Sequence, residues 1–175
     1  MVGYPWRYDR SMNEKRRRVL EDIGPVQAWS CWYSYQTPNE TARKMGALLD
    51  CSHAIDFLRW ILGEPAAIHT VLGPEGQEVM FEARFGLAPG IAHLSLRKPL
   101  ECYWLIEGEH GAVDWIRARD VDYDLNDMYL AEAAHFLACC RGEAQPLTDG
   151  WDARETLRIA LAAKKASEEG RWIAR

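Results

Sequence analysis

GALLDCSHAIDFLRWILGEP, residues 46–65, is the stretch from which the fold of this chain is best read. Its apolar residues recur at helical spacing and Gly63 and Pro65 end the run, which predicts one helix over residues 47–62. The face expected to pack on a sheet consists of Ala47, Cys51, Ala54, Ile55, Leu58 and Leu62. The residues expected to point to solvent are Ser52, Asp56 and Arg59.

Asp50 and His53 lie between these two faces and are three residues apart, so a helix would make their side chains neighbours. A carboxylate beside an imidazole can raise the histidine pKa and fix its tautomer, which makes an acid–base pair or presents two hydrogen-bonding groups to a polyol. Two structural alternatives stay open. Asp50 could cap a helix that begins at Cys51, and His53 could be a histidine satisfied within the fold. No third ligand stands at a predictable spacing, so no metal site is predicted.

Working outward from this helix, the periodicities alternate between the two kinds of secondary structure. Further helices are expected at 11–22, 126–141 and 151–169, and residues 37–46 are expected to form a polar loop. Strands are expected at 26–36, 66–72, 77–85, 91–98, 101–108 and 112–116. Runs of strands beside runs of helices are typical of the α+β class. We therefore expect a single domain over residues 1–175, with a largely antiparallel open β-sheet of about six strands and helices packed on one face.

The strand expected at 26–36 has one almost wholly aromatic face, with Trp29, Tyr33 and Tyr35, and a smaller face on which only Trp32 is large. A solvent-exposed face rarely carries so many rings. Either helices cover this face, or the opposite face of the sheet pairs with another copy of the chain.

Composition excludes several classes of function. The net charge is −5, and the basic run 15–18 has acidic neighbours, so it is expected to be a solvated helix face and not a nucleic-acid contact. No apolar stretch is long enough for a membrane span, and the first residues lack the apolar core of a secretion signal. The five cysteines show no paired spacing and are expected to be reduced thiols in a cytoplasmic protein.

Motifs along the whole chain resemble the C-terminal domain of the glucose–fructose oxidoreductase, inositol dehydrogenase and MocA (Gfo/Idh/MocA) family. The segments that carry the resemblance are Val2-Gly3-Tyr4 with Arg7-Tyr8, Gly24-Pro25-Val26, Gly46-Ala47-Leu48-Leu49-Asp50 with His53-Ala54-Ile55-Asp56, Ile106 to Val113, and Asn126-Asp127-Met128-Tyr129 with Glu132, Phe136, Pro146 and Gly150. Each segment alone is a weak signal, whereas all of them in this order are specific.

The resemblance implies a function. Members of this family pair a Rossmann domain with such an α+β domain and move a hydride between NAD(P) and a sugar, polyol or related substrate. By resemblance, Asp50 and His53 are the catalytic pair and His53 is the acid–base residue. Tyr4, Arg7 and Trp32 are the further candidates for substrate binding. The family commonly dimerises through the open face of the sheet, so a homodimer or higher oligomer is expected.

Two departures from the family pattern change these expectations. The acid and the histidine are four residues apart in many members and three apart here. No G-x-G-x-x-G occurs in the chain, and the family's lysine motif is missing with it, so the sequence begins where the second domain of a complete enzyme would begin. We expect no cofactor to bind this chain alone and no activity without a Rossmann domain, which a separate subunit could supply. The alternative is a non-enzymatic ligand-binding or scaffold domain derived from the family.

Overall fold

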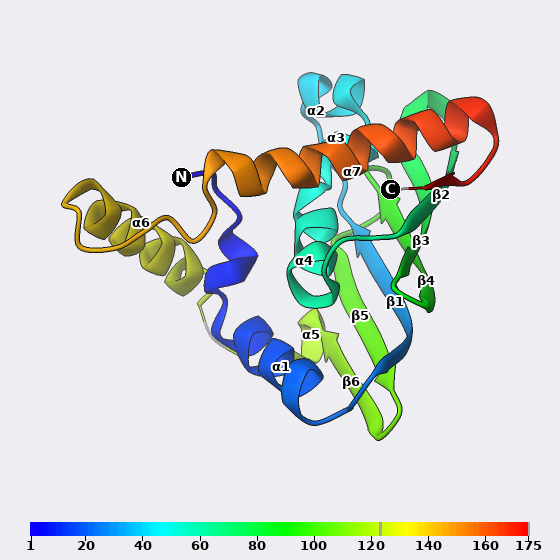
Figure 1. The fold of residues 1–175 in the computed structure, drawn as a ribbon. Helices are drawn as coiled ribbons and strands as arrows, with labels where there is room; N and C mark the ends of the chain where they lie inside the picture. Colours follow the sequence, from blue (N-terminus) through cyan, green and yellow to red (C-terminus); the bar gives the residue numbers. More distant parts are fainter. Residues whose placement is uncertain (123, 175) are drawn as a thin grey trace.

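A seven-stranded sheet forms one layer of the protein, and helices cover one of its faces (Figure 1). The computed structural model describes residues 1–122 and 124–174. Its strands are β1 (Val26–Ser34), β2 (Ala67–Leu72), β3 (Glu78–Phe85), β4 (Ala88–Ser95), β5 (Glu101–Gly108), β6 (Gly111–Ile116) and β7 (Ile173–Ala174). Its helices are η1 (Pro5–Tyr8), α1 (Arg10–Glu21), α2 (Glu40–Met45), α3 (Ala47–Asp50), α4 (Ser52–Leu62), η2 (Pro74–Gly76), α5 (Arg117–Asp120), α6 (Asn126–Cys140) and α7 (Gly150–Glu169).

The strands lie in the order β6-β5-β1-β4-β3-β2-β7. The pair β1–β4 is parallel and the other pairs are antiparallel, so the α+β class is confirmed, whereas the expectation of a largely antiparallel sheet of about six strands holds only approximately. The sequence did not reveal β7, because two residues paired with β2 are too few to show a period. The parallel pair joins strands that are far apart in the chain, which side-chain alternation cannot predict.

The core lies between the sheet and the helices α3, α4 and α7 (Figure 1). The aromatic face of β1 points into it, and Trp29 packs against Phe81 and Phe85 of β3 with ring centroids 6.4 and 5.5 Å apart. Phe57 of α4 packs on Trp104 of β5 at 5.1 Å. Helices therefore cover the aromatic face of β1.

The helix predicted over 47–62 is interrupted. Cys51 leaves the helical conformation, with φ −87° and ψ 23°, and separates α3 from α4. The segment 37–46 is also not entirely a loop, because the Asn39 side chain accepts hydrogen bonds from the backbone N–H groups of Thr41 and Ala42 and thereby starts α2.

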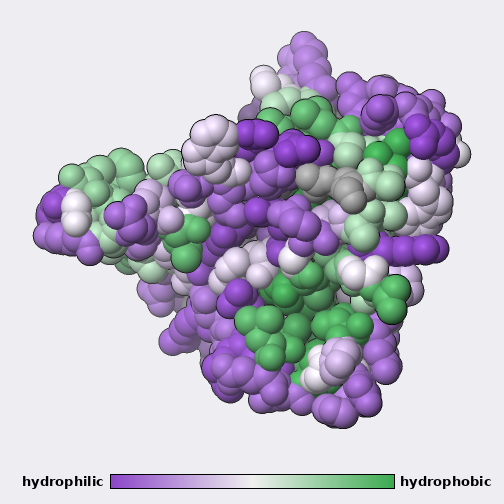
Figure 2. Space-filling view, in the orientation of Figure 1, coloured by the Kyte–Doolittle hydropathy of each residue, from purple (hydrophilic) through white to green (hydrophobic). Residues whose placement is uncertain are grey.

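Helix α6 extends away from the sheet and packs on η1 (Figure 1). The residues that face the domain include Met128 and His135, whereas the exposed apolar residues form a stripe on the outer side, which we call the α6 stripe. The α6 stripe consists of Tyr129, Leu130, Ala133, Phe136, Leu137 and Cys140. Figure 2 shows apolar side chains, in green, on the projecting part of the molecule. A surface helix normally packs its apolar side against the core of its own domain. The exposed α6 stripe is therefore suited to contact with another polypeptide.

The first testable prediction concerns the close pairing of β1 and β4. Gly90 lies opposite Trp29, and a Cβ added there would come within 2.2 Å of the Trp29 carbonyl oxygen and 2.3 Å of its ring. We expect Gly90→Ala to lower the free energy of unfolding by about 1–3 kcal/mol, measured by urea denaturation. Gly150→Ala is the control, because no atom lies within 4 Å of a Cβ at this first residue of α7. Gly90→Ala with wild-type stability would contradict the register.

Candidate functional site

The imidazole of His53 is enclosed by aromatic rings. Tyr4 contacts it edge-on with ring centroids 5.6 Å apart, and Trp6 lies 6.2 Å away. The Nδ1 atom of His53 is buried and has no hydrogen-bond partner within the described ranges 1–122 and 124–174. A buried polar atom without a partner is costly, and in a candidate site it marks a position where a ligand can form the missing hydrogen bond.

Burial lowers the pKa of His53, while the nearby carboxylates of Asp56 and Asp50 act in the opposite direction. The ring is therefore neutral near pH 7 and can accept a proton. Burial raises the pKa of Asp50, and the positive charge of a protonated His53 opposes this. The two groups thus influence each other through charge, but burial outweighs the carboxylates, so the pKa of His53 is lowered and not raised.

Asp50 is the last residue of α3, and its carboxylate accepts a hydrogen bond from the hydroxyl of Tyr35. It does not cap α4, because Cys51 occupies the capping position and no side chain caps that helix. The capping role that remained open for Asp50 is therefore wrong.

An aromatic wall extends from His53 to Asp50. Trp6 packs edge-on against Tyr33 at 5.0 Å, and Tyr33 lies 5.7 Å from Tyr35. Next to this wall is a cavity of about 160 Å³, lined by Trp6, Tyr33, Trp115, Met128 and Tyr129 among others. Aromatic walls with a few polar groups are typical of small-molecule sites. Trp6, Tyr33 and Tyr35 were not predicted as site residues, although the aromatic alternation of residues 26–36 was a signal for Tyr33 and Tyr35.

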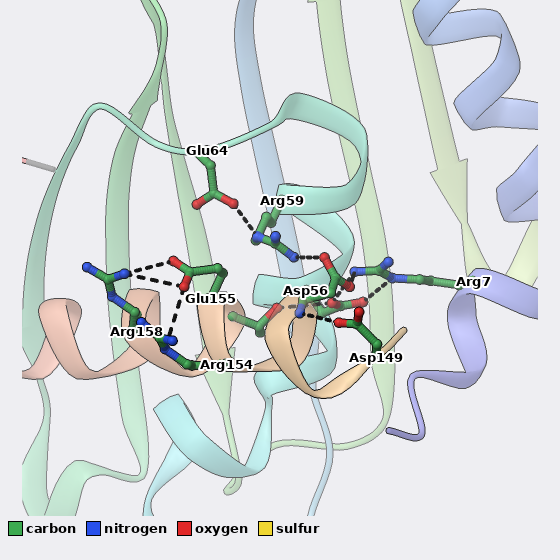
Figure 3. A network of polar contacts seen from close by, with 10 residues as sticks. Arg7, Asp56, Arg59, Glu64, Asp149, Arg154, Glu155 and Arg158 are labelled. Atoms are coloured by element: carbon green, nitrogen blue, oxygen red, sulfur yellow. Dashed lines mark hydrogen bonds and ion pairs between the residues drawn. The ribbon is translucent and has the colours of Figure 1, made fainter. Parts of the chain in front are cut away.

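Arg7 has a different environment from the one expected of a substrate-binding residue. Its guanidinium is 6% exposed and donates to both carboxylate oxygens of Asp56, at 2.9 and 2.6 Å (Figure 3). It also pairs with Asp152 of α7 at 2.8 Å, while Thr156 donates to Asp56 at 3.1 Å. This network joins η1, α4 and α7, and it uses the Arg7 guanidinium to connect these elements.

Asp56 was expected to point to solvent, and this expectation is wrong because the side chain is only 1% exposed. Its partner Arg7 is 49 residues away in the chain, so the helical wheel contained no sign of it. Arg59, on the same side of α4, extends the network by pairing with Asp152 at 2.6 Å (Figure 3).

The remaining two candidates are placed differently. Tyr4 is buried behind His53, and its hydroxyl interacts with the side chains of Ser52 and Thr156. Trp32 lies on the opposite face of the sheet, where its ring is 4.0 Å from His93 and stacks on Tyr103 at 6.1 Å. A ligand held by Asp50 and His53 cannot also contact Trp32. The structure therefore brings Asp50, His53 and Tyr4 together and separates Trp32 from them.

The described residues do not fit a nicotinamide dinucleotide. No strand among them leads through a glycine-rich turn into a helix, the arrangement that binds a pyrophosphate. Over the same residues, no three His, Cys, Asp or Glu side chains are grouped as metal ligands. None of the described helices combines the length and the apolar character required to cross a membrane.

Comparison with known proteins agrees with this fold. Residues 89–174 match the family described as "Oxidoreductase family, C-terminal alpha/beta domain". This match confirms the family resemblance that the sequence motifs predicted. The helix with Asp50 and His53 lies outside the matched segment, whereas the structural comparisons cover it. No match is found among curated proteins.

Solved dehydrogenases share the whole fold. They include a myo-inositol dehydrogenase from Corynebacterium glutamicum (TM-score 0.83, 16% identity), the WlbA dehydrogenase from Bordetella pertussis in complex with NADH and UDP-GlcNAcA (0.84, 17%), and levoglucosan dehydrogenase in complex with NADH and levoglucosan (0.87, 17%). The comparisons cover 99%, 100% and 99% of this chain and 64%, 64% and 65% of those chains, respectively. The chain thus spans less than two thirds of their length, and identity this low shows the fold alone.

The second prediction concerns the ion pair between Arg7 and Asp56. Removing one partner of a buried pair leaves the other charge uncompensated, so Asp56→Ala should lower the free energy of unfolding by about 3–5 kcal/mol, measured by urea denaturation. Arg17→Ala is the control, because it removes only the solvent-exposed pairs with Glu14 and Glu21 and should leave the unfolding midpoint nearly unchanged. A loss of less than about 1 kcal/mol in Asp56→Ala would show that the network is not needed for stability.

Proposed function

We propose that this chain is the substrate-binding and oligomerisation half of an NAD(P)-dependent oxidoreductase that acts on a sugar or polyol. The observation that carries the proposal is the environment of His53: a neutral imidazole with an unpartnered buried nitrogen, next to a carboxylate and inside an aromatic enclosure. A polyol hydroxyl can hydrogen-bond to both groups. During oxidation of that hydroxyl, His53 would accept its proton, and it would return the proton in the reverse direction.

Dehydrogenases of the same fold support the substrate class. Their names include myo-inositol and levoglucosan, which are a polyol and an anhydrosugar, and two of the complexes contain NADH. The nicotinamide would supply the hydride chemistry, and a polypeptide outside these 175 residues would hold it. Positioning of cofactor and substrate provides much of the rate of such a reaction, so the chain alone is expected to be inactive.

The open face of the sheet supports self-association. A row of mostly apolar and aromatic side chains crosses this face from β2 to β6, because each member lies opposite the next in the strand register. The row consists of Val71, Met80, His93, Trp32, Tyr103 and Ile116, of which His93 is polar and pairs with Glu78. A band of large apolar and aromatic side chains on an open sheet face is typical of an interface. We propose that a second copy of the chain packs there and forms a homodimer.

The α6 stripe supports a further partner. It lies on the outer side of a helix whose Tyr129 also lines the cavity beside Trp6, so a polypeptide packed on the stripe would lie close to the candidate site. A cofactor-binding domain, supplied by a separate subunit or by another part of a longer protein, fits this position.

The alternative function is a ligand-binding or scaffold domain without catalysis. It shares the fold and the interfaces but does not need Asp50 and His53 to act together. Sugar binding that depends on His53 would favour the oxidoreductase function over this alternative.

Ligand binding is the third prediction. Isothermal titration with myo-inositol, glucose and levoglucosan should show saturable binding of at least one compound, and His53→Ala should weaken it by about tenfold or more, because a hydrogen bond is lost. His110→Ala is the control, since this residue lies in the β5–β6 turn. Wild-type affinity in His53→Ala would remove the basis of the proposal, and turnover with NAD(P)H by the chain alone would contradict the predicted inactivity.

Oligomeric state is the fourth prediction. Light scattering at micromolar concentration should show a dimer for the wild type and a monomer for Tyr103→Asp, because the substitution buries a charge in the proposed interface. Leu137→Asp in the α6 stripe should remain dimeric. A monomeric wild type, or a dimer that only Leu137→Asp disrupts, would contradict an interface on the open sheet face.

A further inference from the structure

Because the helix is interrupted between α3 and α4, helical spacing does not explain how the side chains of Asp50 and His53 are oriented. In a continuous helix, a spacing of three residues would place both side chains on one surface. Here Asp50 ends α3, Cys51 has φ −87° and ψ 23°, and His53 belongs to α4. The direction of the Asp50 carboxylate relative to the imidazole is therefore set by something other than helical geometry.

Tyr35 is the group that contacts this carboxylate. Its hydroxyl donates a hydrogen bond to Asp50, and this is the one hydrogen bond that the described part of the chain provides to the Asp50 side chain. A phenol that donates to a carboxylate favours its ionised form and restricts its rotamers.

Tyr35 is itself held firmly. Its backbone N–H donates to the carbonyl oxygen of Ser95 at 3.0 Å, directly after the paired stretch of β1 and β4. Its ring lies 5.7 Å from that of Tyr33, which packs edge-on against Trp6. A side chain anchored on the sheet thus reaches across to the end of a four-residue helix that has little rigidity of its own.

We propose that Tyr35 is a positioning residue that holds the Asp50 carboxylate toward His53 and so couples the two groups electrostatically. The inference rests on the proposed function, since it concerns the same pair. It assigns no contact between Tyr35 and the reacting atoms. Instead, the tyrosine replaces the orientation that an unbroken helix would have supplied.

The electrostatic surroundings of His53 make the coupling measurable. Two carboxylates act on its charge, those of Asp56 and Asp50, while the residues packed on it from the start of the chain are the uncharged rings of Tyr4 and Trp6. Because Asp56 is bound by Arg7, we expect it to stay in place when Tyr35 changes. A change of Tyr35 therefore alters the influence of Asp50 alone.

The test is a double-mutant cycle read by NMR on the full chain. The His53 imidazole is titrated in the wild type, Tyr35→Phe, Asp50→Asn and the double variant, with the resonance assigned by its loss in His53→Gln. Because an oriented Asp50 carboxylate raises the pKa of His53, Asp50→Asn should lower that pKa. Tyr35→Phe should reproduce at least half of the fall, and the double variant should show no further fall beyond Asp50→Asn alone.

A role of Tyr35 in packing only would not produce this pattern, because phenylalanine keeps the ring. The control is Tyr103→Phe, which removes a tyrosine hydroxyl on the opposite face of the sheet and should leave the His53 titration unchanged. An unchanged titration in Tyr35→Phe, together with a clear fall in Asp50→Asn, overturns the positioning role. No fall in Asp50→Asn instead shows that Asp50 and His53 are not a pair, which removes the proposed function as well.

A second measurement needs no variant of Tyr35. In the wild type labelled with carbon-13 at the tyrosine Cζ, the Tyr35 resonance should shift with the same midpoint as the Asp50 carboxyl carbon, and this shift should vanish in Asp50→Asn. A Tyr35 resonance that stays constant through the Asp50 titration contradicts the proposal, even if Tyr35→Phe does not fold.

Discussion

The buried ion pair between Arg7 and Asp56 is the interaction on which the candidate site depends. Arg7 belongs to the short helix η1 and Asp56 to α4, so the pair fastens the start of the chain to the helix that carries His53. Tyr4 and Trp6 lie just before Arg7 in the sequence, and the same ion pair places their rings against the imidazole. Asp152 and Thr156 of α7 complete the network. The enclosure of His53 thus depends on a salt bridge between two neighbouring elements.

Sequence patterns predicted those parts of the fold that depend on local periodicity. The strand expected at 77–85 is found as β3, with Val79, Phe81 and Phe85 buried on one face. Helical spacing identified α4, which carries His53. Composition and motif order were sufficient to recognise the family.

The errors arose where distant residues decide the outcome. Asp56 was placed toward solvent because its partners come from η1 and α7. Trp32 was grouped with the site, although strand alternation puts it on the face opposite Tyr33. The break at Cys51 and the parallel pairing of β1 with β4 have no local signature, and the role of Tyr35 emerges only once the break is known.

In the proposed function, the site forms one side of an active site in which Asp50, His53 and the aromatic wall bind a polyol. An NMR titration of the chain with myo-inositol, observing histidine and aromatic side-chain resonances, tests this binding. We expect the signals of His53, Tyr35 and Trp6 to shift together and saturate while those of Trp32 and His93 stay constant. Saturable shifts of Trp32 and His93 with His53 unchanged would contradict it.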